Sequence, residues 1–126
     1  MTDFSNRLKE LNTEYRGKKI RHEKQLDDIQ TNKKMLETAK DEYRELIQKN
    51  RSIISGMAYH GLGINQVLAL EDALYAEISS IDRTLALKDE EFETERRAVN
   101  NEIEDDFVVY KNQCYLINID QEASTV

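Results

Sequence analysis

Apolar residues recur along this chain at spacings of three, four and seven, which is typical of one face of an α-helix. In the first half, two series of positions seven residues apart form one stripe, apolar at both ends and polar in the middle. The series are Leu8, Tyr15, His22, Ile29, Leu36, Tyr43, Asn50 and Met57, and Phe4, Leu11, Lys18, Gln25, Asn32, Ala39, Leu46 and Ile53. A stripe of this kind predicts a long helix that covers one face with a partner helix.

The second half carries a matching stripe. Its series are Ile64, Glu71, Ile78, Leu85, Phe92, Val99, Asp106 and Gln113, and Val67, Leu74, Ile81, Lys88, Glu95, Glu102, Val109 and Leu116. Glycines cluster between the halves: we expect Gly56 to follow a helix end in a left-handed conformation and Asn65 to cap the next helix. The prediction is a first helix over about 4–55, a turn over about 56–64, a second helix over about 65–118 and a frayed tail over 119–126.

Folding the chain back near residue 60 brings the two stripes together. The resulting pairs include Ile53 with Val67, Leu46 with Leu74, Leu11 with Val109, Phe4 with Leu116 and Lys18 with Glu102. We therefore predict an all-α fold, a single domain over 1–126 built as a long two-helix antiparallel coiled-coil hairpin. Residues 107–118 are rich in β-branched and aromatic side chains, which suit a strand, but Phe107, Tyr110 and Cys114 follow helical spacing, so we expect helix. Gly17 predicts local bending or fraying.

Composition supports helices and narrows the partners. The 126 residues include no proline, 34% are charged, and the net charge is −7. Excess acid disfavours nucleic acid or an anionic membrane as partner. The absence of a long apolar run and of a basic-then-apolar start leads us to expect no membrane insertion and a cytoplasmic location. A single cysteine, Cys114, suits a reducing compartment and is expected to act as a buried small hydrophobe.

Candidate chemistry is sparse. His22 and His60 lie too far apart in such a hairpin to share a metal ion, and His22 is expected to pack in the stripe. Acidic pairs such as Asp105 and Asp106 need a pocket to act as acid and base, which two helices do not enclose. We expect no enzyme activity, with no catalytic, cofactor-binding or metal-binding residues and no cofactor.

Two surface features point to partners. A basic run (Arg16, Lys18, Lys19, Arg21 and Lys24) is either attracted to acidic residues of the second helix or meets an acidic partner, or does both. Apolar residues off the stripe join stripe residues near the turn and near the termini, which predicts two docking ends separated by a polar middle. They are Leu26, Ile47, Ile53, Ile54, Met57, Tyr59, Leu62, Ile64, Leu68, Leu70, Tyr75 and Leu87, and Phe4, Phe107, Val108, Tyr110, Tyr115 and Ile117.

The order of these segments resembles the FliJ/YscO family. A basic helix containing Glu42-Tyr43-Arg44 leads through a glycine turn to the segment 65–78, in which Leu74, Ile78 and Leu85 match the family's Leu-x-x-x-Ile-x(6)-Leu pattern. The likeness covers about 35–98, and the whole chain at the level of a hairpin. The short length is most similar to the EscO-type members of virulence type III secretion systems.

This resemblance implies a function. Family members act as a central stalk whose paired termini insert into the hexameric type III secretion ATPase and promote its assembly and activity, while the turn half faces the export gate. It implies a cytoplasmic protein at the inner-membrane base of the secretion apparatus, monomeric alone, with the ATPase as partner and the export gate protein and secretion chaperones as further partners.

The resemblance also suggests which residues face each partner. Export-gate-facing positions would be Leu36, Tyr43, Leu70, Leu74 and Ile78, although all but Leu70 lie on the predicted stripe. The hypothesised ATPase-facing residues are Phe4, Arg7, Lys9, Arg16, Lys19, Asp106, Tyr110 and Lys111. Two alternatives stay open: a coiled-coil secretion chaperone or holdase, and a self-associating structural coiled coil that forms a four-helix bundle.

Overall fold

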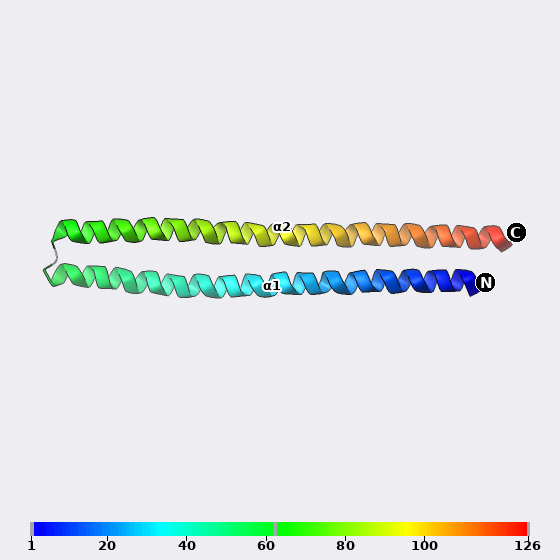
Figure 1. Cartoon of the computed structure of the whole chain (residues 1–126), viewed down its shortest axis with the longest axis horizontal. Helices are drawn as coiled ribbons and strands as arrows, with labels where there is room; N and C mark the ends of the chain where they lie inside the picture. The colour runs from blue at the N-terminus through cyan, green and yellow to red at the C-terminus, as the bar shows by residue number, and fades with distance from the viewer. Residues whose placement is uncertain (1, 62, 126) are drawn as a thin grey trace. The chain divides into compact units, whose positions relative to one another are not determined.

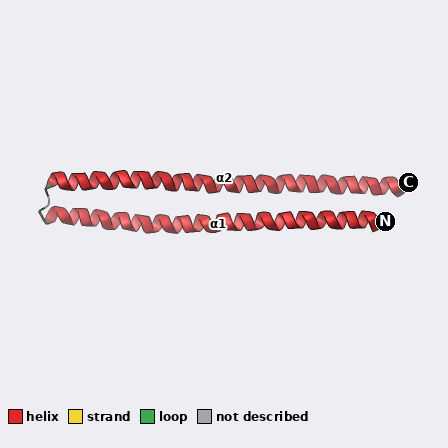
Figure 2. Ribbon diagram, viewed as in Figure 1, coloured by secondary structure: helices red, strands yellow, loops and turns green. Residues whose placement is uncertain are grey.

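The computed structural model describes the backbone of residues 2–61 and 63–125 and the side chains of 3–57, 60, 61 and 63–124. Within these residues the chain forms two α-helices, α1 (Thr2–Tyr59) and α2 (Ile64–Thr125), and no strand (Figures 1 and 2). The all-α prediction is confirmed, including helix over 107–118. Local sequence explains it, because the chain lacks proline and is rich in good helix formers.

The ends of the helices differ from the prediction. α1 continues through Gly56 to Tyr59, and among the described residues Gly61 is the one with a positive φ, 87°. A residue without a Cβ adopts this conformation at low cost. The Gly63 N–H donates to Gln66 Oε1 at 3.2 Å, and the Gly63 carbonyl accepts the N–H groups of Gln66 and Val67. A Gln that reaches back from the first turn is half of a capping box, so Gly63 occupies the cap position predicted for Asn65.

The tail is also helical, in contrast to the predicted fraying over 119–126. α2 continues to Thr125, and Ser124 Oγ donates to the Asp120 carbonyl at 2.9 Å. No glycine or proline follows Gly63, so nothing in the local sequence stops the helix. α1 likewise continues through Gly17. Of the residues predicted to surround the turn, Leu62 and the side chain of Tyr59 lie outside the described residues.

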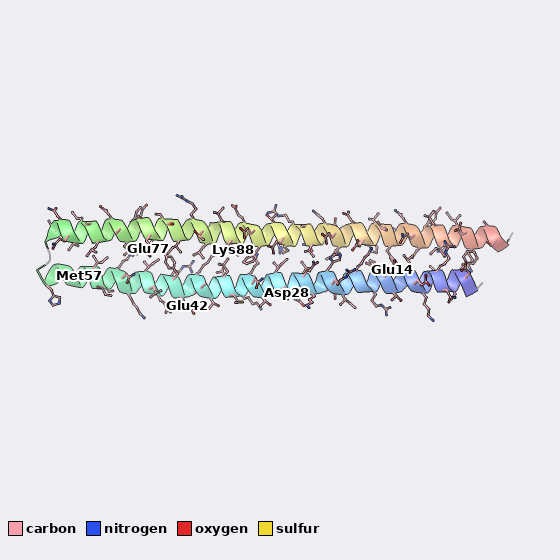
Figure 3. The ribbon with its side chains drawn as sticks, viewed as in Figure 1. Glu14, Asp28, Glu42, Met57, Glu77 and Lys88 are labelled. Carbon is pink, nitrogen blue, oxygen red and sulfur yellow. The ribbon has the colours of Figure 1, made fainter. Side chains whose placement is uncertain are left out.

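The chain divides into two compact units. Unit 1 comprises Met1–Gln30 and Thr94–Val126, and unit 2 comprises Thr31–Glu93. In each unit side chains of α1 and α2 fill the space between the two helices, and others point away from it (Figure 3). The two units are described separately below.

In unit 1 half of the predicted stripe is correct. Buried or half-buried side chains on α1 include Leu8, Leu11, Tyr15, His22, Leu26 and Ile29. On α2 they are Val99, Ile103, Asp106, Tyr110, Cys114, Ile117 and Gln121. Val109 and Leu116 are exposed at 48% and 59%, and Lys18 and Glu102 are also exposed. The predicted pairs of Leu11 with Val109, Phe4 with Leu116 and Lys18 with Glu102 are therefore wrong as interface layers.

Unit 2 shows the same one-residue displacement. Its covered residues include Lys33, Leu36, Lys40, Tyr43, Ile47, Ile54, Val67, Leu74, Ile78, Ile81, Leu85, Asp89 and Phe92. Ile53 is 56% exposed whereas its neighbour Ile54 is 9% exposed, and Leu46 is exposed beside half-buried Ile47. The predicted pairs of Ile53 with Val67 and Leu46 with Leu74 are wrong.

Helix geometry explains the displacement. In α1 the second covered series follows the first by three residues at Leu8 and Leu11, but by four residues at His22 and Leu26. An α-helix has about 3.6 residues per turn, so a fixed seven-residue step drifts by about 20° per heptad relative to a straight helix. A four-residue step in place of a three-residue step corrects the drift and moves every later position of that series.

Candidate functional site

An aromatic contact joins the two helices of unit 1. The Tyr15 ring stacks on the Tyr110 ring with centroids 4.2 Å apart and planes at 12°, and Phe107 lies 6.4 Å from Tyr15. The Tyr110 hydroxyl donates to Asn12 Oδ1. Hydrogen bonding with the Cys114 side chain, followed by burial, raises the pKa of Tyr110 above its usual value. Tyr110 is thus held in the helix interface by contacts on both its face and its hydroxyl.

His22 forms the second polar contact of unit 1. Its Nε2 lies 2.7 Å from Asp106 Oδ2, and its Nδ1 lies 3.1 Å from Gln25 Oε1 and 3.6 Å from Glu102 Oε2. The side chain is only 12% exposed. The hydrogen bond to Asp106, followed by that to Gln25 and the charges of both carboxylates, raises the pKa of His22 despite its partial burial. The prediction that His22 packs in the stripe is confirmed.

A third contact lies close to the chain ends. Arg7 Nη2 lies 3.5 Å from Asp120 Oδ2, and the Arg7 guanidinium is 5.8 Å from the centre of the Phe4 ring. Both charged partners are substantially exposed, so the ion pair contributes little to stability. Phe4 and Arg7 form one local group that also contacts α2.

The hypothesised ATPase-facing residues divide into three groups. Lys9, Arg16, Lys19 and Lys111 are exposed, and Phe4 and Arg7 are half-buried in the group just described. Asp106 and Tyr110 lie in the interface between α1 and α2, where they contact His22, Tyr15 and Asn12. Their polar atoms are therefore engaged in hydrogen bonds between α1 and α2 of unit 1.

The basic run is exposed along its length. Acidic residues that the sequence sets opposite it have other partners: Glu93 forms an ion pair with Lys33, and Glu102 lies beside His22. Attraction to these two carboxylates therefore does not account for the run, which stays available to a partner.

The sequence predicted part of the exposed apolar surface on α2 of unit 1. Phe107, Val108 and Tyr115 are exposed as expected, whereas Tyr110 lies in the interface. Ile117, expected on the surface, is buried, while Val109, Leu116 and Ile119 are exposed. The exposed Phe107 lies near the Tyr15 ring of α1. We call the other exposed large apolar residues of this segment the outer stripe; its members are Val108, Val109, Tyr115, Leu116 and Ile119. Val108, Tyr115 and Ile119 follow spacings of seven and four, so they share one helix face. This spacing is readable in the sequence once the inner face is assigned to Tyr110, Cys114 and Ile117.

A shallow groove lies beside the outer stripe within unit 1. It has a volume of about 320 Å³ and is lined by Arg7, Glu10, Leu11, Glu14, Gln113, Leu116 and Ile117. Leu116 belongs to both the groove and the outer stripe. The groove therefore extends the exposed apolar surface of α2 towards α1, where Glu10 and Glu14 stand at its edge.

In unit 2 the predicted gate-facing residues lie mainly between the helices. Leu36, Tyr43, Leu74 and Ile78 are half-buried, whereas Leu70 is 39% exposed. The Tyr43 hydroxyl is buried and, among the described side chains, is the buried polar atom that lacks a hydrogen-bond partner. Burial, with smaller contributions from Asp82 and Glu77, raises its pKa. Of the five residues, Leu70 is the one that the structure leaves at the surface.

Unit 2 also exposes large apolar side chains. They are Met35, Leu46, Ile53, Ile64, Leu68, Leu70, Tyr75 and Leu87. A groove of about 300 Å³ is lined by Arg51, Ile54, Ser55, Glu71, Leu74, Tyr75 and Ile78. Ion pairs join α1 and α2 elsewhere in unit 2: Lys33 contacts Glu93, and Lys40 Nζ lies 2.6 Å from Asp89 Oδ2.

The described part of the chain contains no cluster of three or more His, Cys, Asp or Glu side chains that could hold a metal ion. In the same residues, neither helix has a stretch that is long and apolar enough to cross a membrane. Comparison of the chain with protein-family models, with curated proteins and with solved structures gives no match. The functional assignment therefore rests on the sequence and on the surfaces described above.

Proposed function

We propose that this chain is a two-helix antiparallel coiled-coil hairpin and the non-enzymatic central stalk of a bacterial type III secretion system. The order of contacts in unit 1 supports the hairpin: Arg7 contacts Asp120, whereas His22, further along α1, contacts Asp106. The resemblance to the FliJ/YscO family motivates the role. In this proposal the chain lies in the cytoplasm at the inner-membrane base of the apparatus and links the hexameric ATPase to the export gate.

One observation carries the proposal: both ends of the chain belong to unit 1, which exposes two chemically different surfaces. α1 presents basic residues such as Arg16 and Lys24, and α2 presents the outer stripe. An asymmetric stalk end in a sixfold ring contacts the ATPase subunits unequally. It biases each subunit towards a conformation in proportion to its differential affinity, which is how a protein without catalytic residues raises ATP hydrolysis.

The test is ATP hydrolysis by the cognate secretion ATPase with and without the chain. We expect the wild-type chain to stimulate hydrolysis and a variant with Phe4→Ala, Arg7→Ala and Lys111→Ala to stimulate it at least several-fold less. A matched control replaces an aromatic residue, an arginine and a lysine in unit 2: Tyr75→Ala, Arg83→Ala and Lys34→Ala. Circular dichroism must show that both variants keep their helix content.

One outcome contradicts the stalk role, and another contradicts the choice of ATPase-facing residues. If the wild-type chain leaves hydrolysis unchanged, the stalk role fails. If the chain stimulates hydrolysis and both triple variants match it, the stalk role stands but Phe4, Arg7 and Lys111 are not the ATPase-facing residues.

A second candidate is a self-associating structural coiled coil, and the exposed apolar side chains of unit 2 favour it. Surfaces such as Ile64, Leu68 and Tyr75 are ones that a second two-helix unit can cover in a four-helix bundle. Light scattering separates the candidates, because the stalk is a monomer alone and the bundle is a dimer.

A further inference from the structure

We infer that the outer stripe of α2 and the adjoining groove in unit 1 form a docking surface for a partner segment with an apolar centre and Lys or Arg flanks. Within the proposed function, on which the choice of ATPase rests, that segment belongs to the secretion ATPase. Apart from Arg7, which lines the groove, the residues of this surface lie outside the set that the family resemblance suggests.

The first argument is exposure. The outer-stripe side chains are between 40% and 66% exposed, although α2 already buries a different face against α1. Ile117 on that inner face is 6% exposed and Val99 is 9% exposed. A helix that only pairs with α1 needs one apolar face. The second apolar face is therefore surplus to the packing of unit 1, and contiguous exposed apolar side chains mark interaction sites.

The second argument is continuity with the groove. Leu116 belongs to the outer stripe and also lines the groove with Leu11 and Ile117. A segment that lies on the stripe can thus insert an apolar side chain beside Leu116. Tyr115, at the centre of the stripe, supplies an aromatic ring of the kind that is enriched at binding hot spots.

The charged residues around the outer stripe and the groove indicate the kind of partner. Glu104 and Asp105 precede the stripe by one turn, Glu122 follows it, and Glu10 and Glu14 line the groove. Arg7 also lines the groove, where its guanidinium is paired with Asp120. Lys111 is the single basic residue between positions 103 and 125. The apolar centre therefore has an acidic rim, and complementary potentials across an interface favour a basic partner and disfavour an acidic one.

The same rim disfavours a second copy of this chain. Two outer stripes packed together in either direction bring the acidic rim of one copy against that of the other. The basic surface of α1, with Arg16, Ile20 and Lys24, carries an opposite charge but just one large apolar side chain among these three. This basic surface of α1 lacks an apolar centre large enough to cover the five residues of the outer stripe. We therefore assign a different protein as the partner of the outer stripe.

The experiment uses the full chain and two synthetic amphipathic helical peptides as probes. Both peptides have the same leucine face, and one has lysine flanks whereas the other has glutamate flanks. We expect the lysine peptide to bind at least about tenfold more tightly in fluorescence anisotropy and to weaken as salt is added. A stripe variant with Val108→Ser, Tyr115→Ser and Ile119→Ser keeps every charge and should lose at least about tenfold in affinity.

The control variant is Ile20→Ser, which removes an equally exposed apolar side chain from α1 of the same unit. It should bind the lysine peptide as the wild type does. Circular dichroism of the stripe variant must show unchanged helix content; single Val108→Ser and Ile119→Ser variants replace it if Tyr115→Ser lowers the helix content. Equal binding of the two peptides, no binding of either, or unaltered binding by the stripe variants overturns the inference.

Two further measurements separate this inference from the proposed function. With the cognate ATPase, stimulation by the wild type but not by the stripe variant supports both, and equal stimulation by the two assigns the ATPase contact elsewhere and overturns the inference. No stimulation by the wild type contradicts the stalk role, and the peptide result then decides the docking surface alone. Dimerisation that the stripe variant abolishes, measured by light scattering, identifies a second copy as the occupant and overturns our assignment.

Discussion

Units 1 and 2 are built from the same two helices but are held together differently. In unit 1 buried aliphatic residues such as Ile29 and Ile117 are joined by polar and aromatic contacts between the helices, with His22 bonded to Asp106 and Tyr15 stacked on Tyr110. In unit 2 the helices meet through aliphatic side chains such as Ile54, and ion pairs such as that of Lys40 with Asp89 lie among them.

These two kinds of contact contribute differently, because apolar burial stabilises the helix pair whereas polar and aromatic contacts determine which residues face each other. Apolar burial is roughly proportional to area and has no direction, so unit 2 tolerates small displacements of its aliphatic layers. Hydrogen bonds and ring stacking require defined geometry, so unit 1 fixes which residues face each other. We expect substitutions of buried apolar residues to be costly in both units, and substitutions of hydrogen-bonded or stacked residues such as His22 and Tyr110 to be an additional cost in unit 1.

The largest effect is expected in the aliphatic interface. Ile54→Ala removes a side chain that is 9% exposed and should lower the free energy of unfolding by about 2–3 kcal/mol. Ile53→Ala changes a neighbour that is 56% exposed and should cost within about 0.5 kcal/mol. Urea unfolding followed by circular dichroism compares the two. Equal losses of unfolding free energy in the two variants would contradict the observed register and place Ile53 in the interface as well.

A pair of glycine substitutions should act in opposite directions. Gly61 has φ 87°, where an L side chain is strained, so Gly61→Ala should destabilise the turn of unit 2 by roughly 1–2 kcal/mol. Gly17 lies inside α1 of unit 1, and an added Cβ meets no atom within 4 Å. Gly17→Ala should therefore stabilise the chain by about 0.5–1 kcal/mol. Thermal unfolding midpoints measure both, and a loss of stability in Gly17→Ala would reveal a constraint at that position.

One chemical change should have opposite signs in the two units. Tyr43→Phe removes a buried hydroxyl without a hydrogen-bond partner and should raise the stability of unit 2 by about 1 kcal/mol or leave it unchanged. Tyr110→Phe removes the donor to Asn12 and should lower the stability of unit 1. Denaturant unfolding of both variants, with the double variant as an additivity check, tests the contrast. Destabilisation by Tyr43→Phe would indicate a water or partner bonded to that hydroxyl.

The smallest effect is a pH dependence confined to unit 1. The pKa of His22 is raised above 6.5, so the folded chain binds this proton more tightly than the unfolded chain does. Its contribution is fully present below about 6.5 and is lost as the pH rises through the folded pKa, with a slope below about 1.4 kcal/mol per pH unit. His22→Gln should abolish this slope, and Asp106→Asn should reduce it. A slope that survives His22→Gln in unfolding midpoints across a bracketing pH series would assign the titration elsewhere.

The sequence was sufficient for the elements and for half of each interface. The seven-residue series through Tyr15, His22, Ile29 and Tyr43 is correct because those positions stay on the inner face. The second series is correct up to Leu11 on α1 and up to Ile81 on α2. Beyond them it is displaced by one residue, since a strict step of seven omits the four-residue step that keeps a stripe on one side of a helix. Lysine adds to the error: Lys33 and Lys40 are counted as polar but place their stems in the interface and their amines on carboxylates.

The candidate site was harder to predict for a related reason. The apolar residues that are free for a partner can be identified only after those in the α1–α2 interface are known. Val109 and Leu116 were predicted in that interface, and their exposure adds them to the outer stripe. The partner of His22 also depends on the pairing register. Asp106 already lies on the predicted stripe, but a fold point near residue 60 sets it opposite residues 14 and 15, whereas the structure pairs it with His22. A charged residue opposite a histidine is not visible in either helix sequence alone.

The stacked rings of Tyr15 and Tyr110, with centroids 4.2 Å apart, have an optical consequence. The chain has six tyrosines and no tryptophan, so no indole emission masks phenol signals in the near ultraviolet. Two phenol rings from different helices at this separation couple their transitions, and the coupling ends when the helices separate. Near-ultraviolet circular dichroism of the unlabelled protein, with Tyr15→Leu as the blank, therefore monitors the closure of unit 1 in real time.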